Sequence, residues 1–567
     1  MSPSPPSPTE PPTPFGFDLP KAFLTFQPIR ISRYSPMSTS LRNDQLASPS
    51  PGSLPPTAEK AVPEKNTYGQ ILKSSALVGG SSVANVAIGI VRTKAMAVLL
   101  GPAGFGLFGL YGSIANLTQT MAGMGINSSG VRQIAVAASS GDTQRIALTT
   151  AVLRRTSIFL GVLGAALLIV FSGPVSALTF GSKDRAGAVC LLSIAVLFTL
   201  ISGGQGALIQ GLRRIADLAK MSVLGALFGT FISIPLVYFF RDKGVVPSLV
   251  AIAAMTIVTS WWYSRKVRVQ APGMTISLAG KEAAALLKLG FAFMSSSLMM
   301  IGVAYAVRVI VLRKVGYAGT GYYQSAWTLG GLYVGFILQA MAADFYPRLT
   351  ASADDNTACN RLVNEQALVG LFLAGPGAIG TLTFAPVIIA LLYSAKFGAS
   401  VGILRWICLG TTLQVITWPM GFIIAAKARA GLLVFCELAW AIVSVGLAWV
   451  CVTYLGLNGS GVAFFGSYVF HVFLIYPIVH WISGFSWSRQ NKQTGLLYLS
   501  LIAVAFFASN ALPLVWAATI GALAVLLSAA HSIRVLLKVM PLNQIPSPIR
   551  GLIIGIGLVP SGATEIS

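Results

Sequence analysis

Long runs of apolar residues, separated by short polar loops, occupy the chain from about residue 72 onward. A helix needs roughly 20 apolar residues to cross the ~30 Å hydrocarbon layer of a bilayer, and the runs reach about that length. Six runs come first, six follow a basic linker, and two lie near the C-terminus: 72–100, 105–126, 147–172, 188–210, 218–240 and 245–263; 289–312, 322–346, 366–393, 403–426, 432–455 and 460–482; 495–511 and 513–533. The pattern predicts an all-α polytopic membrane protein with two six-helix bundles and two extra C-terminal helices.

The composition divides the chain into six segments. The first segment is rich in Pro and Ser, holds no long apolar run or signal-peptide stretch, and is expected to be disordered; translation starts at Met1 or at Met37. The expected segments are a tail over 1–66, an N-terminal six-helix bundle over 67–263, a basic linker with an amphipathic segment over 264–288, a C-terminal six-helix bundle over 289–482, two extra transmembrane helices over 483–540 and a C-terminal tail over 541–567.

A hairpin of two apolar runs, with a cation inside the first, recurs in both sets. Arg92 lies within the first run and Arg308 within the seventh, and a glycine-rich break follows each. Arg132 and Arg348 then close the second and the eighth run. Two similar halves facing one path are a recurrent way to build a transporter. The repeat therefore predicts two pseudo-symmetric bundles.

Composition and charge support a membrane protein. Charged residues make up 10% of the chain, hydrophobic residues make up 55%, and the mean hydropathy is +0.76, which is too apolar for a surface in water. In a soluble protein the net charge of +23 would favour a nucleic-acid partner. Here most Lys and Arg lie in short loops on one side of the predicted spans. Because cytoplasmic loops carry such an excess, both termini are expected in the cytoplasm, and no nucleic-acid partner is expected.

The sequence offers no cofactor or metal site. The five cysteines and three histidines are widely spaced, with neither a CxxC pair nor a histidine cluster. No GxxxxGK[ST] phosphate-binding loop occurs, so no ATP site is expected in this chain.

Arg92, Lys94 and Arg308 are cations inside predicted spans, where a charge is costly unless it faces a polar cavity or reaches the interface. Arg92 lies about 13 Å before the glycine break at 1.5 Å per residue, so it either lines a cavity or extends to the interface. Arg92 and Lys94 are about 200° apart around the helix and are expected to face different surroundings. Arg313 and Lys314, at the end of the seventh run, are interpreted as interface cations.

Short motifs near the ends of the spans resemble those of one family. They are Gly101-Pro102-Ala103-Gly104-Phe105-Gly106, Gly319-Thr320-Gly321-Tyr322-Tyr323-Gln324-Ser325-Ala326-Trp327, Asp344-Phe345-Tyr346-Pro347-Arg348-Leu349, Asn364-Glu365-Gln366, and Ala425-Ala426-Lys427-Ala428 with Glu437. These motifs occur in this order over about residues 70 to 482. With them the chain resembles the polysaccharide repeat-unit flippases, in particular the O-antigen translocases and lipid III flippases. These belong to the multidrug/oligosaccharidyl-lipid/polysaccharide exporter superfamily. The N-terminal tail and the two extra spans lie outside this resemblance.

The resemblance implies two six-helix bundles around a central cavity that opens alternately to each side of the bacterial inner membrane. The substrate it implies is a polyprenyl-pyrophosphate-linked oligosaccharide, such as an O-antigen repeat unit, which moves from the cytoplasmic to the periplasmic leaflet. The partners it implies, besides the lipid bilayer, are a polysaccharide polymerase and a chain-length regulator.

Such a substrate has an anionic pyrophosphate, polar sugars and an apolar tail, so cations and amides are the expected binding groups. The candidate substrate-binding residues are Arg92, Arg308, Lys94, Asn127 and Gln339. The two amides either line a sugar path or hold helices together, and the sequence leaves both open. Candidates for substrate entry, or for coupling to protons or sodium, are Arg132, Arg348, Lys427, Glu437 and Asp344. The cations in this second set equally fit the charge bias of cytoplasmic loops.

Three other functions stay open. A multidrug exporter of the same fold would be expected to rely on acidic and aromatic cavity residues, and this chain has few acids within its spans. An integral-membrane polysaccharide polymerase or glycosyltransferase would need carboxylates near the outer interface, where only Asp184 and Asp242 are expected. The third is a scaffold of a polymer-export assembly.

Overall fold

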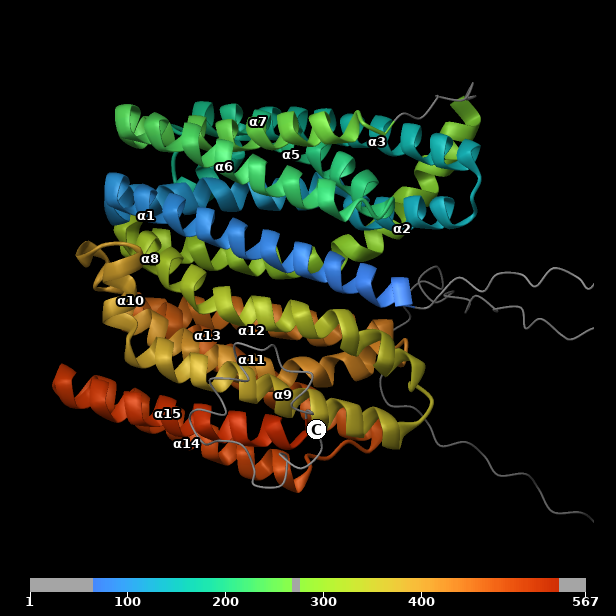
Figure 1. Cartoon of the computed structure of the whole chain (residues 1–567). Coiled ribbons are helices and arrows are strands. Elements are labelled where there is room, and N and C mark those ends of the chain that lie inside the picture. The colour runs from blue at the N-terminus through green and yellow to red at the C-terminus, as the bar shows by residue number, and fades with distance from the viewer. Residues whose placement is uncertain (1–64, 268–275, 540–567) are drawn as a thin grey trace, which may run out of the picture. The chain divides into compact units, whose positions relative to one another are not determined.

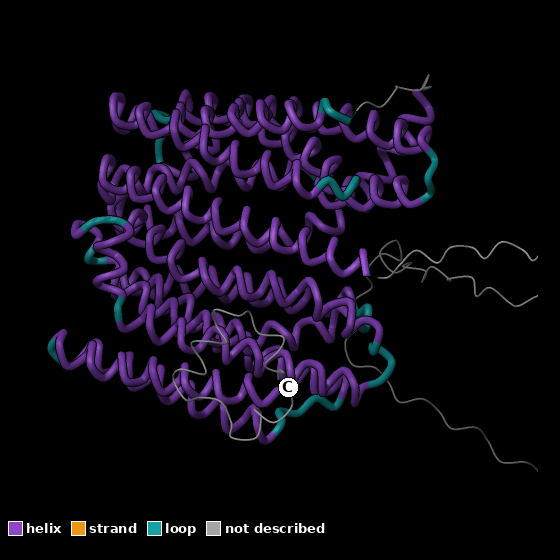
Figure 2. The backbone as a smooth tube through the Cα atoms, viewed as in Figure 1, coloured by secondary structure: helices purple, strands orange, loops and turns teal. Residues whose placement is uncertain are grey.

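The computed structural model describes residues 65–267 and 276–539, apart from some side chains inside the helices. These residues form helices joined by turns and contain no strand, as predicted (Figure 2). The N-terminal tail, the middle of the basic linker and the C-terminal tail lie outside the described residues, so the expectations for them stay predictions.

The helices follow the predicted apolar runs closely. Before the gap they are α1 (Lys65–Gly123), α2 (Ile126–Ser139), α3 (Thr143–Val170), α4 (Ser172–Phe180), α5 (Ala186–Gly211), α6 (Ile215–Phe240), η2 (Arg241–Gly244) and α7 (Val245–Ser264). After the gap they are α8 (Ile276–Ala351), α9 (Asn356–Thr383), α10 (Ala385–Leu392), η3 (Ala395–Phe397), α11 (Ser400–Ala426), α12 (Ala430–Leu455), η4 (Gly456–Asn458), α13 (Gly459–Ser483), α14 (Arg489–Ala511) and α15 (Leu514–Val539). We call α1–α7 the first half and α8–α13 the second half.

The long helices run side by side, so their connections gather at two ends (Figure 1). The kink end, at the left of Figure 1, holds α10 and the connections 181–185, 241–244 and 393–399. Gly101 and Gly316 belong to this end, because the neighbouring Leu99 accepts a hydrogen bond from Arg241 and Arg313 donates one to Leu178. The linker end, at the right, holds the connections 140–142, 352–355 and 427–429.

Helices α1 and α8 are each bent at one glycine, which divides them into a first and a second arm. Gly101 has φ 63° and ψ −175°, and Gly316 has φ 90° and ψ −174°. A positive φ is accessible to glycine without a steric penalty, which explains why each break falls at this residue type. Pro102 then fits the start of the second arm of α1, because the first turn of a helix needs no amide donor there.

The repeat predicted from the sequence extends to the helix caps and turns. Asp142 caps α3 by accepting two backbone N–H groups at 2.8 and 3.1 Å, and Asp355 caps α9 with the same two distances. The tight turn before α6 has Arg213 at φ 55°, and the turn before α12 has Ala428 at φ 54°. Equivalent helix pairs also pack together, such as α3 with α5 and α9 with α11, or α6 with α7 and α12 with α13. The two halves are therefore structural repeats.

Two predicted spans contain a break that the hydropathy pattern did not indicate. The predicted run 366–393 is split into α9 and α10, and the run 105–126 ends at Gly123, after which α2 begins at Ile126. Phe384, with φ −91°, ends α9, and proline occupies the first turn of α10. Proline lacks an amide hydrogen and clashes with the preceding turn, so a continuous helix is disfavoured there. The equivalent break between α3 and α4 has Phe171 at the same φ.

A large hydrophobic cluster joins the halves at the kink end. Its buried members include Met96 and Phe105 from α1, Val311 and Tyr323 from α8, and Tyr393 after α10. Phe105 packs edge-on against Tyr393, with ring centroids 5.5 Å apart. We call this set the kink-end cluster.

The halves also meet near the linker end, where the first arm of α8 approaches α2. A Cβ atom on Gly125 would collide with the carbonyl oxygen of Gly290, and a Cβ on Gly290 would collide with that of Met124. Gly125 has φ 64° at the break between α1 and α2, so this contact depends on glycine at both positions.

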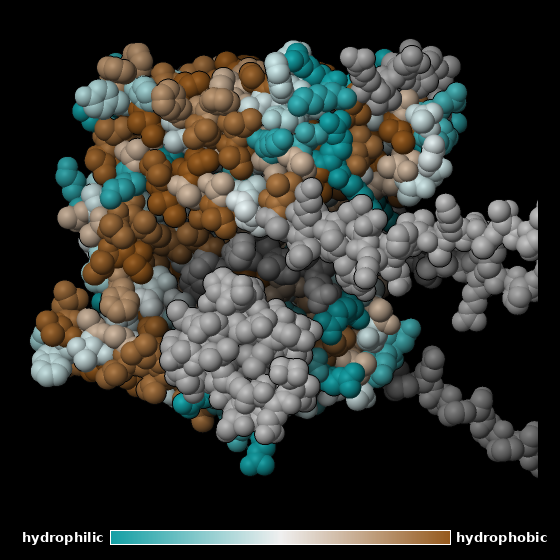
Figure 3. Space-filling model, in the orientation of Figure 1, coloured by the Kyte–Doolittle hydropathy of each residue, from teal (hydrophilic) through white to brown (hydrophobic). Residues whose placement is uncertain are grey.

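The apolar helices make this a multi-pass membrane protein. Nine apolar stretches of the described chain are long enough to cross a bilayer, or ten if the pair Ala279–Ser295 and Ser297–Leu332 of α8, which is bent by 45°, forms one span. Three of the nine hold two long helical segments each: Gly79–Gly123, Ile215–Ser264 and Ala430–Ser483. On the face in Figure 3, apolar residues cover the region toward the kink end, and hydrophilic residues gather toward the linker end.

The two extra helices, α14 and α15, dock on α9 through specific contacts. The Tyr498 side chain is fully buried, and its hydroxyl donates to the carbonyl oxygen of Ser528 at 2.8 Å. The Ser532 hydroxyl donates to the carbonyl oxygen of Phe372 in α9 at 2.9 Å. A Cβ atom on Gly375 would collide with the Tyr498 ring. The hairpin is therefore tightly packed against the second half.

Substituting Gly375 with leucine should separate this hairpin from α9. Overpacking a close contact costs about 1–3 kcal/mol, so we expect the free energy of unfolding to fall by about 2 kcal/mol. Thermal unfolding in detergent, followed by proteolysis of the hairpin, measures the effect. Gly495→Leu is the control, because a Cβ at that position has no neighbour within 4 Å. Equal stability of the two variants would contradict the docking of the hairpin on α9.

Candidate functional site

The second arms of α1 and α8 cross at two glycines close to the kink end. A Cβ atom on Gly106 would lie 2.7 Å from the backbone nitrogen of Gly321 and would collide with the carbonyl oxygen of Tyr317. A Cβ on Gly321 would collide with the carbonyl oxygen of Pro102. The backbones of the two halves are thus in direct contact here, which only glycine permits. The sequence repeat had placed both glycines in equivalent motifs.

Packing around these arms loosens toward the linker end. In α1, Tyr111 and Ile114 are 2% exposed, whereas Met121 is 55% exposed and Asn116 is also exposed. In α8, Ala326 is fully buried and residues 331 and 332 are exposed, whereas Val334 and Leu338 beyond them are buried against α9 and α11. Close packing between the second arms is therefore confined to the kink end.

Arg308 is buried beside the glycine crossing. Its Nε donates to Gln324 Oε1 at 2.7 Å, and its Nη1 donates to the carbonyl oxygen of Ala304 at 2.8 Å. The guanidinium carbon lies 5.9 Å from the ring centroid of Tyr323 and 5.8 Å from that of Trp327, within reach of a cation–π interaction. Arg308 forms no ion pair with a carboxylate of the described ranges. Because Arg308 is buried without an anionic partner, an anionic ligand would bind favourably beside it.

Arg92 and Lys94 lie on different faces of α1, as the helical spacing predicted. Arg92 is partly buried, one turn before Met96 of the kink-end cluster, and its side chain forms no hydrogen bond to another described residue. The Lys94 Nζ donates to the carbonyl oxygen of Leu391 in α10 at 2.6 Å. Arg92 therefore has donors available for a ligand, whereas Lys94 joins the two halves.

Asn127 lines a polar pocket near the linker end, between α2, α5 and α6. The pocket has a volume of about 420 Å³, and Ser128 and Gln210 also line it. A Cβ atom on Gly203 would lie 2.5 Å from Asn127 Oδ1, so the glycine makes room for the amide. Hydroxyl and amide groups of this kind can bind sugar hydroxyls. Gln210 was not among the predicted residues, because its exposure to a pocket depends on tertiary packing.

A cleft of about 310 Å³ lies between the first arm of α1 and the second arm of α8. Asn85 and Thr93 line it from the first half, and Thr328 and Tyr393 from the second. The Asn85 amide donates to the Ser222 hydroxyl at 2.8 Å, which fixes α1 against α6. This cleft is a place where the two halves are not in close contact.

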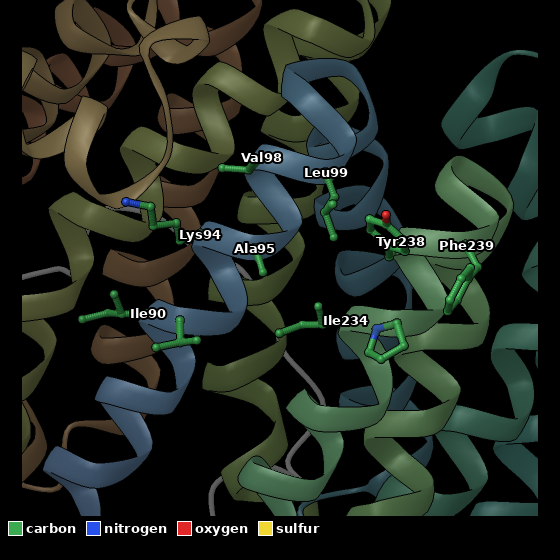
Figure 4. A pocket seen from close by; sticks show the side chains of 10 residues that line it. Ile90, Lys94, Ala95, Val98, Leu99, Ile234, Tyr238 and Phe239 are labelled. Atoms are coloured by element: carbon green, nitrogen blue, oxygen red, sulfur yellow. The ribbon is translucent and has the colours of Figure 1, made fainter.

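An apolar groove of about 640 Å³ lies on the other side of α1, against α6. Its lining includes Ala95, Ile234, Tyr238 and Phe239 (Figure 4). Lys94 stands at its edge, and its amine points away from the side chains across the groove. Phe239 is 74% exposed, so this groove belongs to the apolar surface of a membrane protein.

The remaining predicted residues are dispersed. Arg132 and Arg348 are near the linker end, and Glu437 lies in α12. The Lys427 Nζ donates to the Ala353 carbonyl oxygen at 2.7 Å and to Asn356 Oδ1 at 2.6 Å, which ties two connections of the second half together. The side chains of Gln339 and Asp344 lie outside the described residues, so their roles stay predictions. The described residues contain no cluster of His, Cys, Asp and Glu that could hold a metal ion.

Several contacts between the halves were not foreseen from the sequence. Tyr305 and Thr179 share a hydrogen bond of 2.6 Å between their hydroxyl oxygens. The Arg313 Nη2 donates to the carbonyl oxygens of Ala177 and Leu178 at 2.7 Å each. Arg313 was interpreted as an interface cation, because no sequence pattern indicates which helix end it meets.

Comparisons with known proteins identify one family and relatives of similar length. The sequence pattern of the polysaccharide biosynthesis protein family matches residues 95–402. The lipid III flippase of Escherichia coli (strain K12) is 21% identical over 407 residues, which cover 70% of this chain and 95% of that protein.

Solved structures of two kinds share the fold. The lipid II flippase MurJ in an inward closed conformation has a TM-score of 0.58 at 13% identity, covering 82% of this chain and 99% of that one. An inward-facing multidrug resistance transporter of the MATE family and the MOP superfamily has a TM-score of 0.54 at 17% identity, covering 71% of this chain and 94% of that one.

Proposed function

The chain belongs to the polysaccharide biosynthesis protein family, and we propose that it is a flippase for a polyprenyl-pyrophosphate-linked oligosaccharide. It moves the sugar-bearing head from the cytoplasmic to the periplasmic leaflet of the bacterial inner membrane by alternating access. The observation that carries the proposal is the buried cation Arg308, which has no acidic partner among the described residues and stands next to the crossing of two structural repeats.

The chemistry of the described residues fits such a substrate. A guanidinium donates two parallel hydrogen bonds to a phosphate and stays charged when buried. Arg308 supplies this group from the second half, and Arg92 supplies an equivalent one from the first half. The pocket at Asn127 offers polar contacts to sugars. The conformation packed at the kink end accepts substrate from the linker end, and the excess of Lys and Arg in the loops there supports a cytoplasmic position for that end.

A transport cycle by alternating access is consistent with these positions. The pyrophosphate first meets cations at the linker end, Arg132 and Arg348, and then binds Arg92 and Arg308 deeper in the membrane. The kink end opens after the linker end closes, and the substrate leaves into the outer leaflet. Lys94 contributes a further cation once the halves separate. A polysaccharide polymerase and a chain-length regulator then receive the product.

Complementation tests this function directly. A bacterial strain that lacks its flippase for a polyprenyl-linked repeat unit is expected to regain surface polysaccharide when it expresses this chain. Purified protein in vesicles is expected to move a fluorescent polyprenyl-pyrophosphate-linked sugar between leaflets, measured by loss of quencher-accessible fluorescence. Expulsion of cationic drugs without movement of the lipid would instead identify a multidrug exporter, and polymer formation by the pure protein would identify an enzyme.

A further inference from the structure

Two cations cross between the halves at the kink end, and each ends on the carbonyl groups of a short helix. Lys94 of the first half donates to the Leu391 carbonyl oxygen of α10 in the second half, at 2.6 Å. Arg313 of the second half donates to the carbonyl oxygens of Ala177 and Leu178 of α4 in the first half, at 2.7 Å each. The two contacts run in opposite directions across the same boundary.

The acceptors occupy equivalent positions in the repeat. Helix α4 follows α3 after Phe171, and helix α10 follows α9 after Phe384. Leu178 and Leu391 are each seven residues beyond these phenylalanines. The donors lie on equivalent arms but not at equivalent positions, because Lys94 precedes Gly101 by seven residues and Arg313 precedes Gly316 by three. The pair is therefore reciprocal: each half reaches across to the same carbonyl of the other.

Helix ends explain why these carbonyls attract cations. The last carbonyl groups of a helix lack a partner within it and carry the negative end of the helix dipole, which applies to Leu178 and Leu391. The Ala177 carbonyl oxygen also accepts the Gly181 backbone N–H at 3.0 Å, so Arg313 shares it with the helix cap. A cation that donates to such a group makes a charge-assisted hydrogen bond, which is stronger than a neutral one. The Arg313 guanidinium packs closely against the C-terminal end of α4, since a Cβ atom on Gly181 would lie 2.8 Å from Arg313 Nη1.

Two neighbouring cations at the same end bind within their own half, whereas a third, Arg185 of the first half, stacks on Tyr317 of the second half with its guanidinium carbon 5.1 Å from the ring centroid. The Lys314 Nζ lies 4.5 Å from the ring centroid of Trp449, and both residues belong to the second half. The Arg241 Nη1 donates to the carbonyl oxygen of Leu99, and both belong to the first half. Of these five cations, Lys94 and Arg313 are the two that donate to backbone carbonyls of the other half.

We propose that Lys94 and Arg313 form a reciprocal latch that holds the kink end closed. Each contact exists only while the halves touch at the kink end. Each therefore stabilises the conformation that is closed at the kink end relative to the conformation that is open at this end. Movement of one half against the other breaks both contacts together. The latch rests on the proposed alternation between two conformations, but it needs no particular substrate.

Hydrogen exchange measured by mass spectrometry tests the latch in the full chain without added ligand. The variants are Lys94→Met, Arg313→Met and the double substitution, with Lys314→Met and Arg241→Met as matched controls. We expect amides in 102–110 and 317–325, around the glycine crossing, to exchange about tenfold faster in each single latch variant and faster again in the double variant. The controls should match the parent, and Lys94→Arg should restore protection.

A latch and a general loss of stability predict different exchange patterns. Parent-like exchange in the double variant would overturn the proposal. Equal acceleration in the controls, or acceleration spread over both ends, would also overturn it, because the substitutions would then act on overall stability. Since no transport is measured, failure of the latch is distinguishable from failure of the proposed flippase, which complementation decides.

Discussion

Substituting Gly106 with leucine is expected to abolish transport while leaving a membrane-inserted protein. The side chain would enter the space held by the Tyr317 carbonyl oxygen and the Gly321 backbone, which cannot withdraw as a flexible side chain could. An overpacked contact costs about 1–3 kcal/mol, and more where backbone is the obstacle. At about 3 kcal/mol the conformation closed at the kink end becomes roughly 100-fold rarer.

Surface polysaccharide in the complemented strain measures this loss, and a membrane immunoblot confirms expression. Gly112→Leu is the matched control on the same arm, because a Cβ there has no neighbour within 4 Å. Gly321→Leu should reproduce the defect from the other half. Normal polysaccharide with Gly106→Leu would mean that the crossing does not form during transport.

Substituting Arg308 with methionine is expected to lower the rate of lipid movement in vesicles by roughly 100-fold, equivalent to about 3 kcal/mol for two charge-assisted hydrogen bonds. Methionine keeps much of the length and apolar contact but removes the charge. Arg308→Lys keeps the charge without the planar fork, so it should retain an intermediate rate. Arg92→Met should show a similar loss of transport rate. Its side chain has no hydrogen-bond partner in the described ranges, so this loss should come without a loss of stability.

The choice between a binding role and a structural role rests on the pattern of these variants. Lys314→Met, which removes a cation that stacks on Trp449, is expected to transport at the parent rate. If Arg308→Met unfolds at a lower temperature but Arg92→Met moves the lipid normally, the arginines serve packing and not the substrate. The vesicle assay and thermal unfolding must therefore be measured on the same preparations.

The helix positions could be predicted because each span is a long apolar run bounded by polar turns. The bends at Gly101 and Gly316 could also be predicted, since glycine-rich motifs recur at equivalent places in the sequence. The split between α9 and α10 was not, because hydropathy ignores the local geometry of Phe384 and the proline after it. Apolar content defines a span, but it does not define its breaks.

The candidate site was less predictable. The different surroundings of Arg92 and Lys94 followed from helical spacing alone. The partners of Lys94 and Arg313 are backbone carbonyls far away in the sequence, and every residue has a carbonyl, so no residue type marks them. The burial of Arg308 against Tyr323 and Trp327 likewise arises only when two helices pack.

The contact between Gly125 and Gly290 makes the two sides of the molecule unequal. Two repeats that face each other meet along two lateral seams. One seam is closed at the linker end by this contact and farther along by the hydrogen bond of Tyr305 with Thr179. The other seam contains the cleft lined by Asn85 and Thr328. Among the described residues, the cleft lies on the seam that these contacts leave open. If the chain carries the lipid-linked cargo proposed above, we expect the hydrophobic tail of that cargo to extend into the bilayer on this side.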